Sequence, residues 1–211
     1  LGGWNGFSFG KDAAEMSPNS SHMTVAAYNG GWDEGEGPPS QTDASYFHVL
    51  NQVSQSIIPV AQKHTAEIAT LNKERTAKMR LGTYEAGPGY AMNGLNNARV
   101  TPQQAQAQEE VMKSQAAGVA TIDSFLAMAY LGYDTQNFFT FSEGDRWTSH
   151  TKWHRGGHAH PSWMLLSLFN RESLGDMLVT QTVSTPRANL NGFGRRQSTD
   201  NAPLTAVYAT R

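Results

Sequence analysis

The stretch that decides the fold class is residues 79–90, Met-Arg-Leu-Gly-Thr-Tyr-Glu-Ala-Gly-Pro-Gly-Tyr. A short apolar run, residues 79–84, leads directly into Glu85 and a Gly-Pro-Gly turn, which is typical of a buried strand that ends at a polar residue. Similar runs occupy residues 23–28 and 136–141, and helical patterns separate the three. Residues 23–172 therefore predict the order β-α-β-α-β-α, with parallel strands joined by right-handed crossovers.

Three helical patterns connect and follow these strands. The first extends from about residue 43 to residue 78 with apolar positions near the 3.6-residue period, and Pro59 should kink or divide it. The second begins at Thr101-Pro102 and reaches about residue 131, with an interruption expected near Gly118. The third begins at Pro161 and continues to about residue 169, and residues 1–22 are expected to be loop.

The alternation fits either a (β/α)-barrel or a doubly wound open sheet. No Gly-x-Gly-x-x-Gly follows the first strand, so a dinucleotide-binding fold has no support. Three strands alone would leave two edges and broad apolar helix faces uncovered, and a barrel needs eight. We therefore expect an α/β fold in which residues 1–175 are the C-terminal portion of a (β/α)8 TIM barrel. Residues 176–211, with strands at 177–183 and 204–209, are expected to begin a β-sandwich domain.

Composition excludes several classes of protein. The chain has 211 residues, 16 Lys plus Arg and 18 Asp plus Glu, a formal net charge of −2, so it lacks the basic excess of a nucleic-acid binder. There is no Cys, which excludes disulfides and thiolate metal sites. No apolar stretch approaches the length of about 18 residues that a membrane span needs. The chain starts at Leu1 without Met, and we expect a missing N-terminal part of the same chain.

Polar and aromatic side chains gather where the predicted strands end. Because the active site of a (β/α)-barrel lies at the carboxyl ends of its strands, these residues are the candidate site. Glu85 is the leading residue, as a catalytic or ligand-binding carboxylate; the alternative is an ion pair with Arg80 or Arg146. The others after the three strands are Tyr28, Asn29 and Trp32, then Tyr90, then Glu143, Arg146, Trp147 and His150.

Aromatic rings beside a carboxylate suit sugars, because sugar rings have apolar C–H faces and polar edges. Trp147 and Trp32 are the expected stacking residues, whereas Trp163, within an apolar helical run, is expected in the core. Four histidines between residues 150 and 160 (His150, His154, His158, His160) keep a metal site open as an alternative. They lack a helical His-Glu-x-x-His pattern, so a substrate contact by one of them is favoured.

Residues 81–90, with Val25-Ala-Ala-Tyr-Asn29 before them and Phe139-Thr-Phe141 and Trp147 after them, resemble the last three β/α units of retaining glycoside hydrolases built on (β/α)8 barrels. The resemblance implies that Glu85, at the position of strand seven, is the nucleophile. It implies that Tyr28 orients that carboxylate and that Trp147 forms the floor of a sugar subsite. It also implies a small β-sandwich after the barrel.

One departure from that family concerns the general acid/base, which is a Glu, usually after Asn, at the end of strand four. No Asn-Glu pair occurs in this chain. Retaining hydrolysis needs two carboxyl groups about 5–5.5 Å apart, and Glu143 is the second carboxylate closest to the expected place. The acid is therefore expected upstream of Leu1, and this chain alone is expected to be inactive.

The resulting hypothesis is a retaining glycosidase with a carbohydrate substrate, no cofactor, no nucleic acid and no membrane span. Export from the cell is expected by analogy with polysaccharide-degrading enzymes, while the residues themselves leave the compartment open. Two alternatives stay open: a non-catalytic carbohydrate-binding barrel, and a metal-dependent barrel enzyme that uses the histidines at 150–160.

Overall fold

The computed structural model describes residues 2–3, 7–29, 50, 53–88, 102–141, 148–173, 175–191 and 197–211. Its main sheet contains β1 (Gly2–Gly3), β2 (His22–Asn29), β3 (Arg80–Pro88) and β4 (Tyr133–Phe138). The helices are α1 (Phe7–Glu15), α3 (Ile58–Glu74), α4 (Pro102–Met112), α5 (Gln115–Tyr130) and α6 (Pro161–Glu172). A π-helical turn, η1 (Val53–Ile57), precedes α3, and a 3-10 turn, η2 (Trp153–Arg155), precedes α6.

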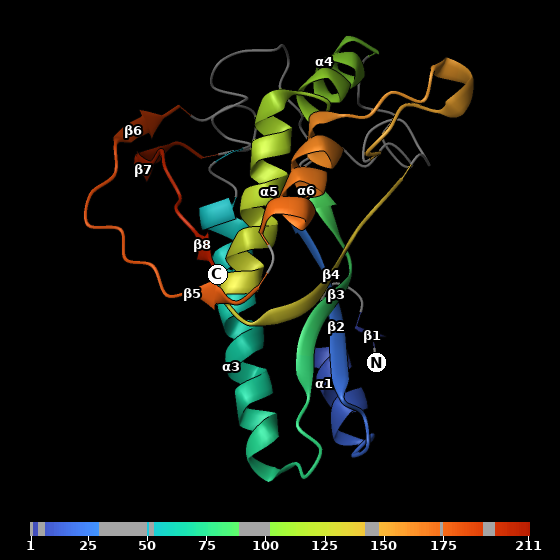
Figure 1. Cartoon of the computed structure of the whole chain (residues 1–211), viewed down its shortest axis with the longest axis vertical. Helices are drawn as coiled ribbons and strands as arrows, with labels where there is room; N and C mark the ends of the chain where they lie inside the picture. The colour runs from blue at the N-terminus through green and yellow to red at the C-terminus, as the bar shows by residue number, and fades with distance from the viewer. Residues whose placement is uncertain are drawn as a thin grey trace.

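The main sheet is open, and the expectation of a partial TIM barrel is wrong. Its four strands are all parallel in the order β1-β2-β3-β4, so within the described residues the sheet ends at β1 on one side and at β4 on the other. Figure 1 shows the strands side by side with α3 and α5 standing against one face. The β-α alternation was predicted correctly, but closure depends on the number and shear of strands, which no local pattern records.

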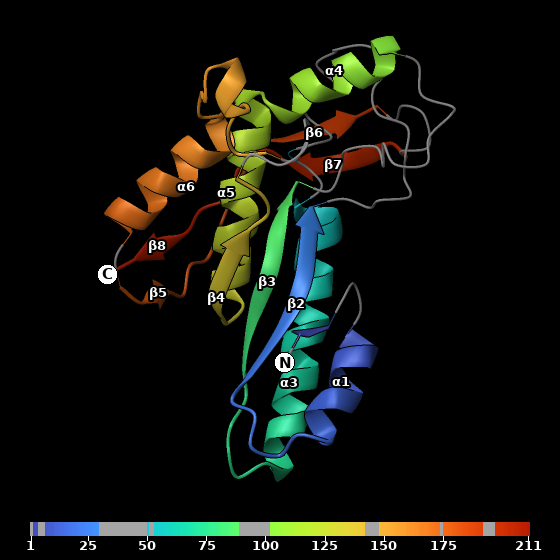
Figure 2. The ribbon, with the colours of Figure 1, turned by 90° about the vertical axis from the view of Figure 1, so that its right-hand side faces the viewer.

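The C-terminal part forms two small antiparallel ladders instead of the start of a β-sandwich. Strand β5 (Met177–Leu178) pairs with β8 (Ala209–Thr210), and β6 (Arg187–Leu190) pairs with β7 (Thr199–Pro203). Each ladder has two strands. Figure 2 shows them apart from each other, β5 and β8 beside α5 and α6, and β6 and β7 at the other end of α5. Such short ladders have no face broad enough to stack as a sandwich.

The hydrophobic core lies between one face of the sheet and the two helices α3 and α5. Strand β2 alternates strictly, with Met23, Val25 and Ala27 buried and the residues between them partly exposed. The buried side chains join Ile68 of α3 and Phe125 of α5 in one cluster. The structure shows one apolar face covered by helices and one face of mixed polarity.

Several element boundaries differ from the expected ones for local reasons. Pro59 lies in the first turn of α3, directly after η1, so the chain changes from π-helix to α-helix just before Pro59 without leaving the helical conformation. The second helix is divided at Ser114, whose hydroxyl caps α5 by accepting a hydrogen bond from the N–H of Ala117 at 3.2 Å. Gly118 instead lies inside α5, and helix α1 occupies a segment that was expected to be loop.

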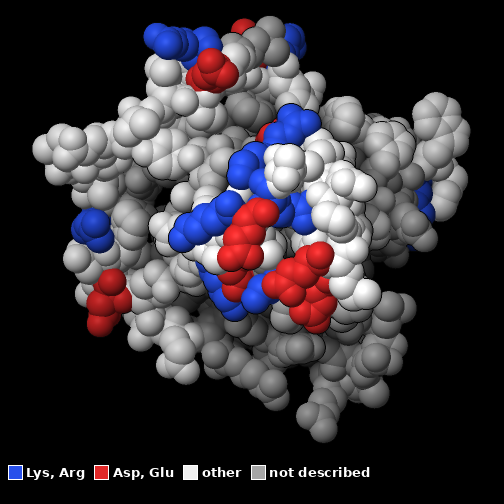
Figure 3. All heavy atoms as spheres, turned by 90° about the horizontal axis from the view of Figure 1, so that it is seen from below, with Lys and Arg blue, Asp and Glu red and all other residues white. Residues whose placement is uncertain are grey.

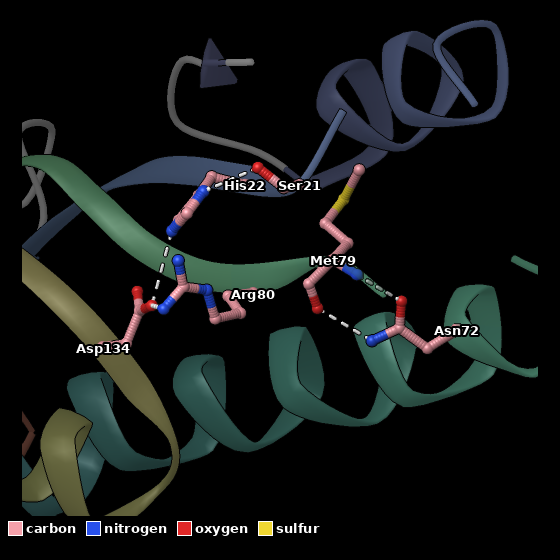
Figure 4. Close-up of polar contacts among 6 residues, drawn as sticks. All are labelled: Ser21, His22, Asn72, Met79, Arg80 and Asp134. Atoms are coloured by element: carbon pink, nitrogen blue, oxygen red, sulfur yellow. Dashed lines mark hydrogen bonds and ion pairs between the residues drawn. The ribbon is translucent and has the colours of Figure 1, made fainter. Parts of the chain in front are cut away.

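The amino ends of the strands are held by ionic and amide contacts. Asp134 of β4 accepts Arg80 of β3 at 3.1 Å and lies 3.4 Å from Nε2 of His22 on β2 (Figure 4). Asn72 of α3 exchanges two hydrogen bonds of 2.8 Å with the backbone of Met79, which fixes the start of β3 on the helix (Figure 4). Arg80 therefore pairs with Asp134 at the amino end of the sheet.

Charged side chains of both signs gather on the face drawn in Figure 3, which looks at the molecule from below. Two ion pairs join residues on successive helical turns, Lys11 with Glu15 at 3.6 Å in α1 and Lys63 with Glu67 at 4.0 Å in α3. Mixed signs at this separation give no extended field of one sign. In the parts of the chain that the structure covers, no helix has the length and apolar character to cross a membrane.

Candidate functional site

Glu85 lies inside β3, three residues before its end, because the strand continues through the Ala-Gly-Pro segment to Pro88. The register against β2 shifts between Val25 and Ala26, so that Thr83 pairs with Val25 and Glu85 pairs with Ala26. The extra residue is Tyr84, and this β-bulge turns Glu85 onto the face of the sheet that the helices leave partly exposed. The bulge is what presents the carboxylate.

Tyr28 lies on the same face, because it follows Ala26 by two residues in β2. The Glu85 carboxylate acts on the Tyr28 phenol through its charge and as a side-chain hydrogen-bond acceptor. The pKa of Tyr28 is raised well above its usual value, first by burial and then by the negative charge and hydrogen bond of Glu85. The pKa of Tyr84 is raised too, by burial and then by the charge of Glu85. The structure thus brings the two predicted catalytic residues together.

The carboxyl end of β4 reaches the same place. The backbone N–H of Phe139, just after β4, donates to the carbonyl of Ala86 at 2.8 Å, next to Glu85. The ring of Phe139 meets that of Tyr28 edge to face, with centroids 6.5 Å apart. The ring of Tyr28 therefore packs against a residue that follows β4, while its hydroxyl faces Glu85. Strands β2, β3 and β4 together fix the geometry of this pair.

Asn137 of β4 fastens the bulge from the other side. Its side-chain amide donates to the carbonyl of Thr83 at 2.9 Å, and its backbone N–H donates to the Thr83 hydroxyl at 3.1 Å. The register between β3 and β4 shifts at this point, between Thr83 and Ala86. Both carbonyl and hydroxyl of the residue before the bulge are therefore occupied, which restrains the backbone that carries Glu85. Sequence reasoning missed Asn137, because its role depends on register.

Asn29, a predicted substrate contact, lies on the other face of the sheet. By strand alternation it shares the helix-covered face with Val25 and Ala27, and its exposed fraction is 1%. Neither polar atom of its side chain has a hydrogen-bond partner. The structure does not bring Asn29 together with Glu85.

His150 is part of an aromatic cluster that the sequence did not predict. The rings of Phe141 and Trp163 have centroids 4.6 Å and 5.0 Å from the imidazole and 6.3 Å from each other, so the three rings contact one another. Phe141 is 61% exposed and Trp163 42% exposed, so the cluster faces solvent and Trp163 is not the core residue that was expected. Six of the seven residues from Trp163 to Phe169 are apolar, which hides the side of α6 that is buried, so no sequence signal marks Trp163 as exposed.

A short hairpin holds the cluster in place. His150 bridges to Ala159, and the N–H of His150 donates to the carbonyl of Phe141 at 3.0 Å. The Ser149 hydroxyl bonds the same carbonyl at 3.1 Å and lies 2.9 Å from Nδ1 of His150. The cluster follows β4, so it lies toward the same end of the sheet as Glu85.

The four clustered histidines do not converge on a point. His154 and His158 are exposed, and Nδ1 of His160 is 2.7 Å from the carbonyl of Thr148. Burial lowers the pKa of His160, which disfavours the charged form of this ring. Within the described residues no group of three His, Asp or Glu side chains is placed to hold a metal ion.

The remaining predicted site residues lie outside the described residues: Trp32, Tyr90, Glu143, Arg146 and Trp147. An ion pair of Glu85 with Arg146, which was one alternative to a catalytic role for Glu85, therefore also falls outside the described residues. Its other alternative partner, Arg80, is engaged by Asp134.

Comparison with known proteins adds no family. No protein-family model matches the chain, and the search of curated proteins gave no significant match. The comparisons therefore lend no support to the resemblance with glycoside hydrolases, and a functional proposal has to stand on the geometry around Glu85.

Proposed function

We propose that this protein is a glycoside hydrolase in which Glu85 is the nucleophile and Tyr28 orients it. The observation that carries the proposal is that the two side chains share one face of the sheet, where the charge and hydrogen bonding of Glu85 act on the Tyr28 phenol. An oriented carboxylate with one oxygen held by a phenol has its second oxygen available to attack. The bulge and the clamp by Asn137 supply the rigidity that a nucleophile needs.

The proposed reaction is a double displacement. A Glu85 oxygen forms a bond to the anomeric carbon while the bond to the leaving oxygen breaks, and a second carboxylic acid gives that oxygen its proton. Water then attacks the glycosyl ester, gives its proton to the same second group, and releases Glu85 as the carboxylate. The second carboxyl group comes from outside the described residues, and Glu143 is the residue of this sequence to test for it.

A carbohydrate-binding protein without turnover is the second candidate. The exposed rings of Phe141 and Trp163, in contact with each other and with His150, favour it, because they offer stacking surface whether or not bonds are broken. The two candidates differ in what Glu85→Gln does: it abolishes hydrolysis in the first and leaves binding of sugar intact in both.

The experiment is covalent trapping of Glu85. A panel of 4-nitrophenyl glycosides identifies a substrate for the full-length protein, and the matching 2-deoxy-2-fluoro glycoside is then used as a slow inactivator. Trypsin releases residues 81–99, in which Glu85 is the only acidic residue. We expect the added mass on that peptide, and a fall in kcat of at least about a thousand-fold in Glu85→Gln.

Glu172→Gln is the matched control, since Glu172 is an exposed carboxylate that pairs with Arg171. It should retain full activity. Absence of turnover across the panel, or labelling of another peptide with Glu85→Gln fully active, overturns the proposal.

A further inference from the structure

A cavity of about 580 Å³ lies on the far side of the helix layer from Glu85. Its walls come from the start of α3, from α5 and from the C-terminal segments, and they are mainly apolar: Leu50, Ile58, Val119, Ile122, Leu190 and Leu204. Volumes of about 300–1,000 Å³ with mostly apolar walls and few polar groups are typical of sites for small organic ligands. Nothing in the proposed hydrolysis uses this cavity.

Among the described residues that line the cavity, Asp123 of α5 is the one with a charged side chain. Its Oδ1 accepts a hydrogen bond of 2.7 Å from the hydroxyl of Tyr208. The ring of Tyr208 meets that of Tyr130, with centroids 6.4 Å apart, and both tyrosines line the same cavity. A carboxylate and two aromatic rings are therefore presented together in an otherwise apolar wall.

This combination fits a cation. A carboxylate in an apolar wall costs free energy unless an opposite charge or hydrogen-bond donor meets it. Burial raises the pKa of Asp123, with the hydrogen bond from Tyr208 acting in the opposite direction, so a bound cation would favour the ionised form. The tyrosine faces attract an ammonium group through their quadrupole, and the aliphatic walls accept a hydrocarbon chain.

We propose that the cavity binds an amphiphilic organic cation, an ammonium group on an aliphatic chain, with the ammonium at Asp123 and the chain along the α5 wall. The charge at Asp123 rejects the corresponding carboxylate, and a neutral alcohol gains only the apolar part of the interaction. The proposed occupant of the cavity is a small molecule. The competing occupant is a lysine side chain of a partner protein.

The test compares three ligands of one chain length by titration calorimetry at pH 7.5: octylammonium, octan-1-ol and octanoate. We expect octylammonium to bind at least ten-fold more tightly than either of the others. In Asp123→Asn the octylammonium affinity should fall at least ten-fold, with octan-1-ol unchanged. Asp12→Asn, at an exposed aspartate of α1, is the matched control and should behave as wild type.

Val119→Trp keeps the proposal testable if Asp123→Asn does not fold. Val119 is 41% exposed and lines the cavity, so a larger side chain there fills space without entering the core. It should weaken both octylammonium and octan-1-ol. Equal affinity for the three ligands, unchanged octylammonium binding in Asp123→Asn, or no octylammonium binding by the wild type overturns the proposal. The last result would favour a partner protein as the occupant.

Discussion

At the residue scale, Tyr28 and Glu85 each change the properties of the other. The carboxylate raises the pKa of the phenol by its charge and hydrogen bond, in addition to the effect of burial. In return the phenol fixes one carboxylate oxygen. Their pairing was predictable, because both residues follow apolar runs of neighbouring parallel strands. The geometry that produces it, a bulge at Tyr84, was not predictable.

Removal of the Tyr28 hydroxyl tests the orienting role. We expect Tyr28→Phe to lower kcat by about 10- to 100-fold, because a hydrogen bond to a charged group is worth about 1.5–3 kcal/mol. The ring contact with Phe139 is retained, so KM and melting temperature should change little. Steady-state kinetics on the substrate found for Glu85 give the measurement. An unchanged kcat would show that Tyr28 does not orient the nucleophile.

His64 makes stability depend on pH. Its Nδ1 lies 2.9 Å from the Tyr133 hydroxyl in the core, and burial, followed by the charge of Lys63, lowers its pKa to about 4. In the unfolded chain the pKa of His64 is about 6.5. Below that pH the imidazole binds a proton in the unfolded chain, whereas in the folded protein it stays neutral until the pH approaches its lower folded pKa. Stability should therefore fall by about 2–3 kcal/mol between pH 6.5 and pH 4.

Urea unfolding across that pH range measures the effect. His64→Gln removes the titrating group, so its stability should vary less with pH than that of the wild type. Parallel curves for the two proteins would assign the pH dependence to other groups, His160 first among them, since burial lowers its pKa in the same direction.

At the element scale, Gly118 shows why a glycine inside a helix was misinterpreted. The sequence suggested a helix break, but α5 continues through Gly118. A Cβ at this position would lie 2.7 Å from Cβ and 2.9 Å from the carbonyl carbon of Pro161, the first residue of α6. The glycine is needed for the close approach of two helices, which is a property of their packing and not of α5 itself.

Gly118→Ala should therefore destabilise the protein by about 1–3 kcal/mol, although Ala favours an isolated helix by about 1 kcal/mol. Thermal unfolding compares it with Gln115→Ala, at an exposed position in the first turn of α5, which should lie within about 0.5 kcal/mol of wild type. Stabilisation by Gly118→Ala would mean that α5 and α6 do not pack this closely.

At the scale of the whole molecule, Arg75 joins the N-terminal segment to the helix layer. Its guanidinium donates to the carbonyls of Ala14, Ser17, Pro18 and Ser20, at distances between 2.7 and 3.0 Å. These carbonyls belong to the end of α1 and the connection to β2. One side chain thus donates hydrogen bonds to the backbone carbonyls of a turn that would otherwise be held only by its own local hydrogen bonds.

Arg75→Ala should lower the free energy of unfolding by about 2–3 kcal/mol, because net contributions of about 1 kcal/mol per hydrogen bond are lost. Arg75→Lys should recover only part of it, since an ammonium cannot reproduce the planar fork. Lys73→Ala, an exposed position in the last turn of α3, is the control in urea unfolding. Equal effects of Arg75→Ala and Lys73→Ala would contradict this role.

What the sequence determined by itself is the β-α order of residues 23–172 and the choice of candidate residues. Apolar runs and helical periods gave three parallel strands with helices between them, and polar residues after those runs marked Glu85 and Tyr28. The tertiary structure decided the rest. The sheet is open because closure depends on how many strands meet and with what shear. Asn29 faces the helices while Tyr28 faces away, because neighbouring residues of a strand point to opposite faces. Contacts between residues far apart in the chain set both outcomes, and no short stretch of sequence contains them.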